Sequence, residues 1–486
     1  MSERNLYITT TLPYVNSDPH VGFALEIVHA DIMARYKKLC GFDVFFNTGT
    51  DEHGSKVHAK ALENGKDPQE YVNEYAEKFK GLKKVLGLSE DINFIRTTDE
   101  FHKKSAQAFW KKCADNGYIY KKNYKMKYCV GCELEKTDSE LVDGKCPIHP
   151  NTELQLIEEE NYFFKFSDFQ ERLLKLYEDR PDFVLSSSRF NEIKSFVSRG
   201  LEDFSISRLK SKMPWGVPVP GDDEQVMYVW FDALVNYVSA IGWPDDMEKF
   251  NKYWPVVQFA GKDNLRQQSA MWQAMLMAAD IEPSKQIVIH GFINSGGQKM
   301  SKSLGNVINP YDVVSEYGTD ALRYFLAREM NTFEDSDFTM EKFKESYNAN
   351  LANGIGNLTS RIMKMAETHL ESSGLSTPDS FNALLHLQSE EGKEYKEALD
   401  SFDIKKASDI IWREIKQTDA FIQSEQPFKL IKMDLEKGKT QIKRFVVYLA
   451  RIAVMLEPVL PDTAQKIKDA IKANAMPSAP LFARKD

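Results

Sequence analysis

An apolar run followed by a basic loop with two leading glycines most constrains how this chain can fold. Residues 286–293 have the length and β-branched content of a buried strand. Residues 296–305 follow, with two glycines that permit a tight turn and with Lys299 and Lys302 three residues apart. Loops at the carboxyl ends of parallel strands bind ligands in α/β proteins. The pattern suits a phosphate-binding loop, although by charge alone a solvated basic loop is the more common interpretation.

Composition indicates a soluble protein of several domains. The chain has 486 residues, 42% of them hydrophobic, which predicts two to four domains. Its net charge of −9 argues against a surface that binds nucleic acid throughout, so an RNA partner would need a local basic patch. Residues 121–127 are a candidate patch, although a solvated face is equally compatible. We expect a cytoplasmic location, because the N-terminus has no signal-type run and no apolar window approaches the length of a membrane span.

A strand, a turn and a helix start follow one another near the N-terminus. Residues 6–11 are rich in β-formers, and residues 12–19 contain two prolines and Asx residues typical of a turn. Apolar residues then recur with helical spacing from position 21 to position 32. Such a junction binds anions, since free N–H groups and the helix dipole point at the ligand. His20 and Gly22 are therefore candidate nucleotide contacts, although a surface histidine is the more common role.

Three of the five cysteines form a metal-ligand pattern. Two residues stand between Cys129 and Cys132 and two between Cys146 and His149, and 13 residues separate the pairs. This Cys3His set predicts one closed, tetrahedral, structural Zn²⁺ site without an open position for catalysis. The odd cysteine count argues against a disulfide framework.

These motifs resemble the signatures of the class I aminoacyl-tRNA synthetases. The string Lys-Met-Ser-Lys-Ser at 299–303 resembles their second signature, and His-Val-Gly-Phe at 20–23 resembles the first, with Phe23 in place of the usual second histidine. Leu-Pro-Tyr-Val-Asn at 12–16 is similar to the methionyl-tRNA synthetase branch. The resemblance implies an α/β fold: a class I Rossmann-like nucleotide-binding domain with an inserted zinc-knuckle connective domain, followed by an all-α anticodon-binding helical bundle.

The resemblance also implies roles around the nucleotide. The implied ATP contacts are His20, Gly22, Gly261, Asp263, Lys299, Met300, Ser301, Lys302 and Ser303. Of these, His20, Lys299 and Lys302 are the implied catalytic groups, joined by Arg208, which would reach substrate phosphates. A surface salt bridge is the other interpretation of Arg208. Attack by a substrate carboxylate needs no protein nucleophile, so catalysis would consist of positioning and charge stabilisation with Mg²⁺.

A methionine pocket is implied in the same way. Its members are Thr11, Leu12, Tyr14, Asp51, Trp230, Ala233, Tyr237, Asn264 and Gln268. Asp51 would hold the substrate α-ammonium group, which needs an ion partner once desolvated. Trp230 and Tyr237 would pack on the thioether, whereas their pattern alone predicts core aromatics. Asn264 and Gln268 stand where an apolar residue and a histidine are usual in the family.

The last third of the chain predicts helices only. From about residue 345 helical periods continue without strand patterns. The resemblance implies that Asn357, Arg361 and Phe428 read the anticodon, with Phe428 in place of a tryptophan; pattern alone would make them ordinary helix residues. The expected domains are 1–117 (first catalytic half), 118–222 (connective insertion with zinc knuckle), 223–325 (second catalytic half), 326–344 (stem-contact connector) and 345–486 (anticodon-binding bundle).

The implied function is that of a methionyl-tRNA synthetase, which forms methionyl-adenylate from methionine and ATP and charges the 3′-terminal ribose of tRNA(Met). We expect initiator and elongator tRNA(Met) as partners, no membrane contact, and a monomer. Two alternatives stay open. One is a class I synthetase for another amino acid such as cysteine, whose zinc would need an open position. The other is a catalytically weak, synthetase-derived RNA-binding protein that has lost ATP binding.

Overall fold

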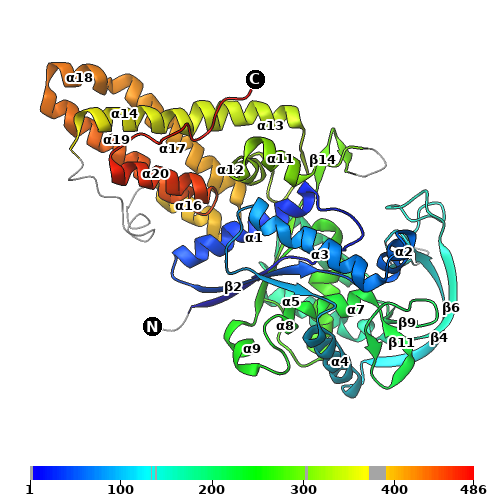
Figure 1. Ribbon diagram of the computed structural model, residues 1–486. Helices are drawn as coiled ribbons and strands as arrows, with labels where there is room; N and C mark the ends of the chain where they lie inside the picture. The colour runs from blue at the N-terminus through cyan, green and yellow to red at the C-terminus, as the bar shows by residue number, and fades with distance from the viewer. Residues whose placement is uncertain (1–3, 133, 137–139, 301–304, 372–389) are drawn as a thin grey trace.

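The computed structural model describes residues 4–132, 134–136, 140–300, 305–371 and 390–486. The chain forms two lobes, one built on a parallel sheet and the other a bundle of helices projecting from its side (Figure 1). Within the described ranges, no helix has both the length and the apolar character to cross a membrane.

A parallel sheet forms the centre of the larger lobe. Its strands are β1 (Asn5–Thr9), β2 (Asp43–Thr50), β3 (Asn93–Arg96), β7 (Val184–Leu185), β12 (Val256–Gly261) and β13 (Gln286–His290). Their spatial order is β3-β2-β1-β12-β13-β7, and every neighbouring pair is parallel. The order reverses between β1 and β12, where Tyr7 pairs with Val256. A doubly wound sheet opens a ligand crevice at this point, and the predicted α/β class is confirmed.

Helices cover the two faces of this sheet. They are α1 (Val21–Leu39), α2 (Ser55–Glu63), α3 (Pro68–Val85), α4 (Glu100–Asp115), α7 (Val229–Leu234), α8 (Asn236–Ser239), α9 (Met247–Tyr253), α10 (Trp272–Ala278), α11 (Pro310–Tyr317) and α12 (Thr319–Tyr324), with short turns η3 (Lys262–Asn264), η4 (Gln267–Met271) and η6 (Phe325–Glu329). Alternate residues of a strand face opposite sides. Leu6 and Ile8 accordingly pack into the core shared with α1, whereas Tyr7 packs into the core shared with α4 and α10.

A long hairpin extends from the larger lobe. Strands β4 (Ile119–Cys129) and β6 (Gln155–Phe164) pair antiparallel from Ile119↔Phe164 to Tyr128↔Gln155, and β5 (Leu134–Lys136) and β8 (Phe204–Ser205) flank them. The same part of the chain contributes η2 (Phe166–Phe169), α5 (Gln170–Asp179), α6 (Ser187–Ser198), β9 (Ser207–Leu209), β10 (Pro218–Val219) and β11 (Asp222–Met227). Figure 1 shows β4 and β6 curving along the outer edge of the lobe.

Two strands of the central sheet lie where the sequence did not predict them. β3 gives no apolar run that would predict a strand, because three of its four residues are half-buried. β7 lies within the expected insertion, yet Val184 pairs with Ile287 of β13. Residues 118–222 therefore return to the sheet before β8, and the insertion is anchored there as well as at its ends.

The smaller lobe consists of helices. After the three-stranded sheet of β14 (Ile293–Ser295), β15 (Gln298–Lys299) and β16 (Ser336–Asp337), the chain forms α13 (Met340–Ser346), η7 (Tyr347–Gly356), α14 (Asn357–His369), α16 (Glu390–Asp400), α17 (Ile404–Glu425), α18 (Pro427–Met433), α19 (Leu435–Leu456) and α20 (Pro461–Ala473). The described residues beyond 345 include no strand, as predicted. The C-terminal segment returns along the bundle, where Tyr347 donates to the Ala483 carbonyl (Figure 1).

A buried arginine joins the two lobes. Arg323 of α12 lies 2.8 Å from Asp31 of α1, and both side chains are fully buried. The same guanidinium donates to the carbonyls of Pro458 and Val459 at 2.9 Å, just before α20. Arg323 therefore ties the first helix of the nucleotide fold to the last helix of the bundle.

Candidate active site

A cavity of about 810 Å³ opens at the carboxyl ends of the central strands. Thr11 follows β1, Asp51 follows β2, Asp263 follows β12, and His290 ends β13; all four line it. The cavity therefore occupies the switch point of the sheet, where this architecture binds ligands.

The cavity gathers the predicted ATP and methionine residues that the structure describes. They are Thr11, Leu12, Tyr14, His20, Gly22, Asp51, Trp230, Ala233, Tyr237, Gly261, Asp263, Asn264, Gln268, Lys299 and Met300. Ser301, Lys302 and Ser303 lie outside the described residues. Residues predicted from separate motifs along the first 300 positions thus share one space.

His20 is the N-cap of α1. Its Nδ1 accepts a hydrogen bond from the Gly22 amide at 3.1 Å, so in the neutral ring Nε2 carries the proton and can donate. Burial, and then the charge of Lys299, lower the pKa of His20, which keeps the ring neutral at pH 7. A Cβ atom on Gly22 would lie 2.8 Å from His20 Cε1, so this close approach requires glycine. The geometry suits a neutral donor to phosphate at a helix N-terminus.

Lys299 lies on a tight hairpin at the mouth of the cavity. Gly296 and Gly297, with φ of 63° and 75°, form the two-residue turn between β14 and β15. Positive φ at both positions is the requirement of a type I′ turn, which explains the two glycines of the motif. The Lys299 ammonium lies 4.8 Å from the centre of the Phe292 ring. A compact cation is thereby presented near His20.

Asp51 lies at the floor of the cavity, 9% exposed. Backbone bonds fix the loop after β1 to it: the Asp51 amide donates to the Pro13 carbonyl at 3.0 Å, and the Val15 amide donates to the Asp51 carbonyl at 3.2 Å. Tyr14 and Asp51 form an isolated parallel bridge. These bonds hold the Leu12–Tyr14 wall beside a carboxylate suited to a substrate ammonium group.

A buried carboxylate between two histidines fixes the short helix that carries Trp230. Asp232 of α7 lies 2.6 Å from His53 Nδ1 and 2.9 Å from His102 Nε2. Burial raises the pKa of Asp232, but His53 and His102 outweigh it and hold the pKa at about 2. Trp230 and Ala233 lie on the same short helix. The ionised network therefore fixes α7 between the end of β2 and α4.

Two buried polar side chains, Gln268 and Tyr237, line the cavity. Gln268, 2% exposed, donates from Nε2 to the Tyr237 hydroxyl at 2.8 Å. Gln268 lies on the π-helical turn η4, a local irregularity common at functional sites. Burial raises the pKa of Tyr237, so that it stays a neutral phenol.

Glu26 and His290 are among the cavity residues that sequence interpretation missed. Glu26 accepts from the Thr11 amide and hydroxyl, both at 2.6 Å, and lies 2.8 Å from His290 Nε2. Burial lowers the pKa of His290, but the hydrogen bond and charge of Glu26 outweigh it, so the pKa lies above its ordinary value. A glutamate among the buried residues of a helix was the available signal.

Arg208 is not in the cavity. It lies on β9, 6% exposed, donates to Ser205 Oγ at 2.8 Å and to the Ser207 carbonyl at 2.7 Å, and packs over the Tyr228 ring. A surface salt bridge does not describe this environment, because β9 pairs with β11 and the side chain is buried. The contact with substrate phosphates stays a prediction. The resemblance alone carried no information about that pairing.

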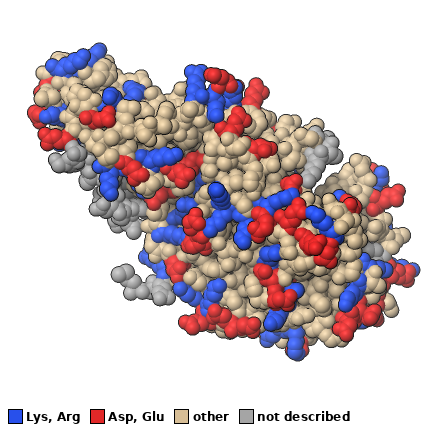
Figure 2. Space-filling model, in the orientation of Figure 1, with Lys and Arg blue, Asp and Glu red and all other residues tan. Residues whose placement is uncertain are grey.

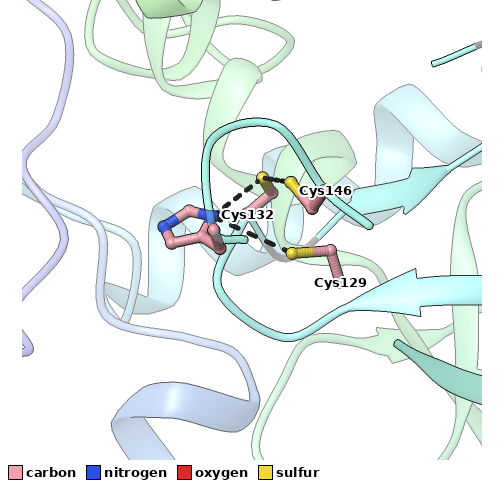
Figure 3. A group of neighbouring side chains, drawn as sticks. Cys129, Cys132 and Cys146 are labelled. Atoms are coloured by element: carbon pink, nitrogen blue, oxygen red, sulfur yellow. Dashed lines mark hydrogen bonds between the residues drawn. The ribbon is translucent and has the colours of Figure 1, made fainter. Parts of the chain in front are cut away.

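Cys129, Cys132, Cys146 and His149 come together at the end of the β4–β6 hairpin. Figure 3 shows the three cysteines converging, and the four ligand atoms lie within 4.8 Å of one another. Measured separations are 3.4 Å for Cys132–Cys146, 3.2 Å for Cys132–His149 and 3.8 Å for Cys129–His149. Tetrahedral Zn²⁺ places such donors about 3.6–3.8 Å apart. The donor set therefore fits a closed zinc site.

The predicted anticodon residues lie in the bundle. Asn357 is exposed at the start of α14, Arg361 pairs with Asp419 of α17, and Phe428 of α18 is 47% exposed. Figure 2 shows Lys and Arg side chains over the outer end of the bundle, where α18 carries Lys429 and Lys432. An exposed aromatic ring among lysines suits single-stranded RNA.

The strand order and the cavity at its switch point, bordered by the His20 and Lys299 motifs, define a class I aminoacyl-tRNA synthetase. The family described as tRNA synthetases class I (M) matches residues 6–155 and 149–363, and the anticodon binding domain of methionyl tRNA ligase matches residues 373–480. The chain belongs to the methionyl-tRNA synthetase family.

Individual relatives agree. Methionine–tRNA ligase of Thermotoga maritima is 42% identical over 97% of this chain and 76% of its own length. The Rickettsia typhi enzyme is 39% identical over 96% of this chain and 92% of its own length. The structure of Mycobacterium tuberculosis methionyl-tRNA synthetase with methionyl-adenylate superimposes with a TM-score of 0.89, at 36% identity, over 96% of this chain and 93% of that one.

Proposed function

We propose that the cavity activates methionine with ATP and that the product is transferred to tRNA(Met). The observation that carries the proposal is the convergence of a carboxylate (Asp51), an aromatic wall (Trp230, Tyr237) and two phosphate-type donors (His20, Lys299) in one space at the switch point. Asp51 binds the α-ammonium group, and the aromatic wall packs against the thioether.

The first step is in-line substitution at phosphorus. A methionine carboxylate oxygen forms a bond to the α-phosphorus of ATP. The bond between this phosphorus and the oxygen that bridges to the β-phosphate breaks, and pyrophosphate leaves. His20 Nε2 and Lys299 neutralise charge that develops on the phosphate oxygens, and Mg²⁺ accompanies the ATP. In the second step a hydroxyl of the tRNA 3′-terminal ribose attacks the carbonyl carbon, and AMP leaves.

Amino-acid-dependent ATP–pyrophosphate exchange tests this function. Exchange with each of the twenty amino acids in turn, with Mg²⁺, is expected with methionine alone. Exchange with cysteine would point to a synthetase of different specificity. Absence of exchange from folded, zinc-loaded protein would contradict the enzymatic function and favour the RNA-binding alternative.

The Cys3His cluster is proposed to hold one structural Zn²⁺. Replacing Cys146 by serine removes one of four ligands, so zinc content should fall from one per chain to below about 0.1. Elemental analysis after dialysis against a weak chelator measures this content. The matched control is Cys40→Ser, because Cys40 lies outside the cluster. This variant should keep one zinc ion per chain. Full zinc content in the Cys146 variant would contradict the proposed ligand set.

The outer end of the bundle is proposed to bind the anticodon of initiator and elongator tRNA(Met). Replacing Phe428 by alanine should raise the KM for tRNA about tenfold, since stacking of one base contributes about 1–3 kcal/mol, and should leave pyrophosphate exchange unchanged. Phe101→Ala is the matched control, because Phe101 is 49% exposed but lies on α4 of the other lobe. Equal effects of both changes on charging would contradict the assignment.

We also infer a monomer in the cytoplasm. Sedimentation equilibrium of the purified protein tests the first. A mass of 55.8 kDa is expected for the monomer.

A further inference from the structure

A buried chain of hydrogen bonds lies behind the cavity wall and ends at Tyr237. Ser284 Oγ lies 2.6 Å from Gln258 Oε1, Gln258 Nε2 lies 2.9 Å from Gln268 Oε1, and Gln268 Nε2 lies 2.8 Å from the Tyr237 hydroxyl. Gln258 and Ser284 are 1% and 0% exposed. Gln268 and Tyr237 line the cavity, whereas the other two side chains stand behind it.

Two backbone groups determine which atom donates and which accepts in each of these hydrogen bonds. The Ser284 amide can only donate, and it donates to Gln273 Oε1 at 2.9 Å. The Gln268 carbonyl can only accept, and it accepts from Gln273 Nε2 at 2.7 Å. Gln273 is thereby oriented, and its Nε2 also donates to Ser284 Oγ at 3.2 Å. The Ser284 hydroxyl therefore gives its own hydrogen to Gln258.

Each side-chain amide keeps the same order of donor and acceptor. Gln258 accepts with its oxygen and donates with its nitrogen, and Gln268 does the same toward Tyr237. The Tyr237 oxygen accepts from Gln268, so this bond does not use the hydroxyl hydrogen. Gln258 and Asn236 also lie near the hydroxyl. Because amides and a serine hydroxyl do not titrate near neutral pH, the direction is independent of pH there.

We propose that Ser284, Gln273 and Gln258 are positioning residues that aim the Tyr237 hydroxyl hydrogen into the amino-acid pocket. The proposal rests on the methionine site proposed above. A donor at the inner end of the pocket favours a side chain with an acceptor there, such as a thioether, over a hydrocarbon of equal length. Amino-acid specificity would thus depend on residues that never touch the substrate.

Replacing Gln258 by glutamate should reverse the donor–acceptor order of the hydrogen bonds between position 258 and Tyr237, at nearly constant side-chain volume. A carboxylate accepts only, so Gln268 must turn its nitrogen toward position 258 and its oxygen toward Tyr237. The hydroxyl hydrogen then points away from the pocket. In pyrophosphate exchange, the ratio of kcat/KM for methionine to that for norleucine should fall about 5- to 10-fold, the effect of about one hydrogen bond. Ser284→Ala should lower the ratio in the same direction.

Gln225→Glu is the matched control. Gln225 is also 1% exposed and lies between the Ser207 hydroxyl and the Glu160 carbonyl, both at 2.7 Å, in another sheet. Its ratio should equal that of wild type. In a Tyr237→Phe background, Gln258→Glu should no longer change the ratio, which a general packing defect would still do.

An unchanged ratio in both Gln258→Glu and Ser284→Ala, with methionine exchange intact, would overturn the proposal. So would equal changes in Gln258→Glu and Gln225→Glu. Absence of methionine exchange from wild-type protein would instead contradict the proposed function itself, so the two failures are distinguishable.

Discussion

Replacing Asp51 by asparagine is expected to lower kcat/KM for methionine in pyrophosphate exchange by about 100- to 4,000-fold. Removal of one partner from a desolvated ion pair costs about 3–5 kcal/mol, and each 1.4 kcal/mol is tenfold. Asp51 is 9% exposed at the floor of the cavity. A methionine ammonium bound there would have lost most of its water, so the neutral amide could not replace the carboxylate.

A substrate analogue makes the assignment specific. The 2-hydroxy acid corresponding to methionine lacks the ammonium group, so its kcat/KM should change little between wild type and the Asp51 variant. Asp43→Asn, at the opposite end of β2 and paired with Lys252 at 2.6 Å, should leave both substrates unaffected. An equal loss for methionine and the hydroxy acid would mean that Asp51 acts on the fold and not on the ammonium group.

Replacing Arg323 by methionine should destabilise the protein by about 3–5 kcal/mol, because it removes one partner of a buried pair and three carbonyl contacts. Arg323 donates to the carbonyls of Leu86, Pro458 and Val459 as well as pairing with Asp31. Hydrogen exchange of the α20 amides should rise with the loss, since that helix follows two of these carbonyls. Chemical denaturation followed by circular dichroism measures the stability change.

The surface pair Lys405–Asp409 supplies the control, with side chains 36% and 47% exposed. Lys405→Met should cost about 0–1 kcal/mol. Unchanged α20 exchange in the Arg323 variant would contradict the assignment of this residue as the link between the lobes.

Acid should reduce the difference between wild type and the Arg323 variant. Burial raises the pKa of Asp31, but the charges of Arg323 and Arg35 outweigh it, so the folded pKa lies below its ordinary value. A depressed carboxyl pKa contributes stability that is complete above the unfolded pKa of about 3.9 and is lost as pH falls through the folded pKa. The deficit of the variant should therefore be full near pH 7 and shrink below about pH 4.

The sequence was sufficient to predict two of the strands whose ends carry chemistry. β1 and β13 are buried runs of β-forming residues followed by turn residues, and that pattern is strong in one sequence. β3 and β7 gave no such signal, because β3 is half-buried and β7 contains two residues. Short edge strands are decided by tertiary pairing, which a local pattern does not contain.

Some residues of the candidate site were likewise predictable from the sequence and others were not. Thr11, His20 and Lys299 follow directly from motifs next to predicted strands, and the structure brings them together. Glu26 and Arg208 illustrate what motifs leave out. Glu26 lies inside a helix whose buried face looked apolar, and Arg208 is turned inward by a pairing between β9 and β11. Both depend on which surfaces meet, and spacing along the chain does not specify that.

The pairing of β1 with β12 has a consequence for synthesis on the ribosome. Tyr7 and Val256 are neighbours in the sheet although about 250 residues separate them. At a synthesis rate of about 5–20 residues per second, roughly 10–50 s pass between the synthesis of β1 and that of β12. During that interval the first strand exposes an edge that could pair wrongly, since long-range strand pairing is slow and prone to aggregation. Production of intact protein should therefore depend on chaperones that protect nascent N-terminal segments.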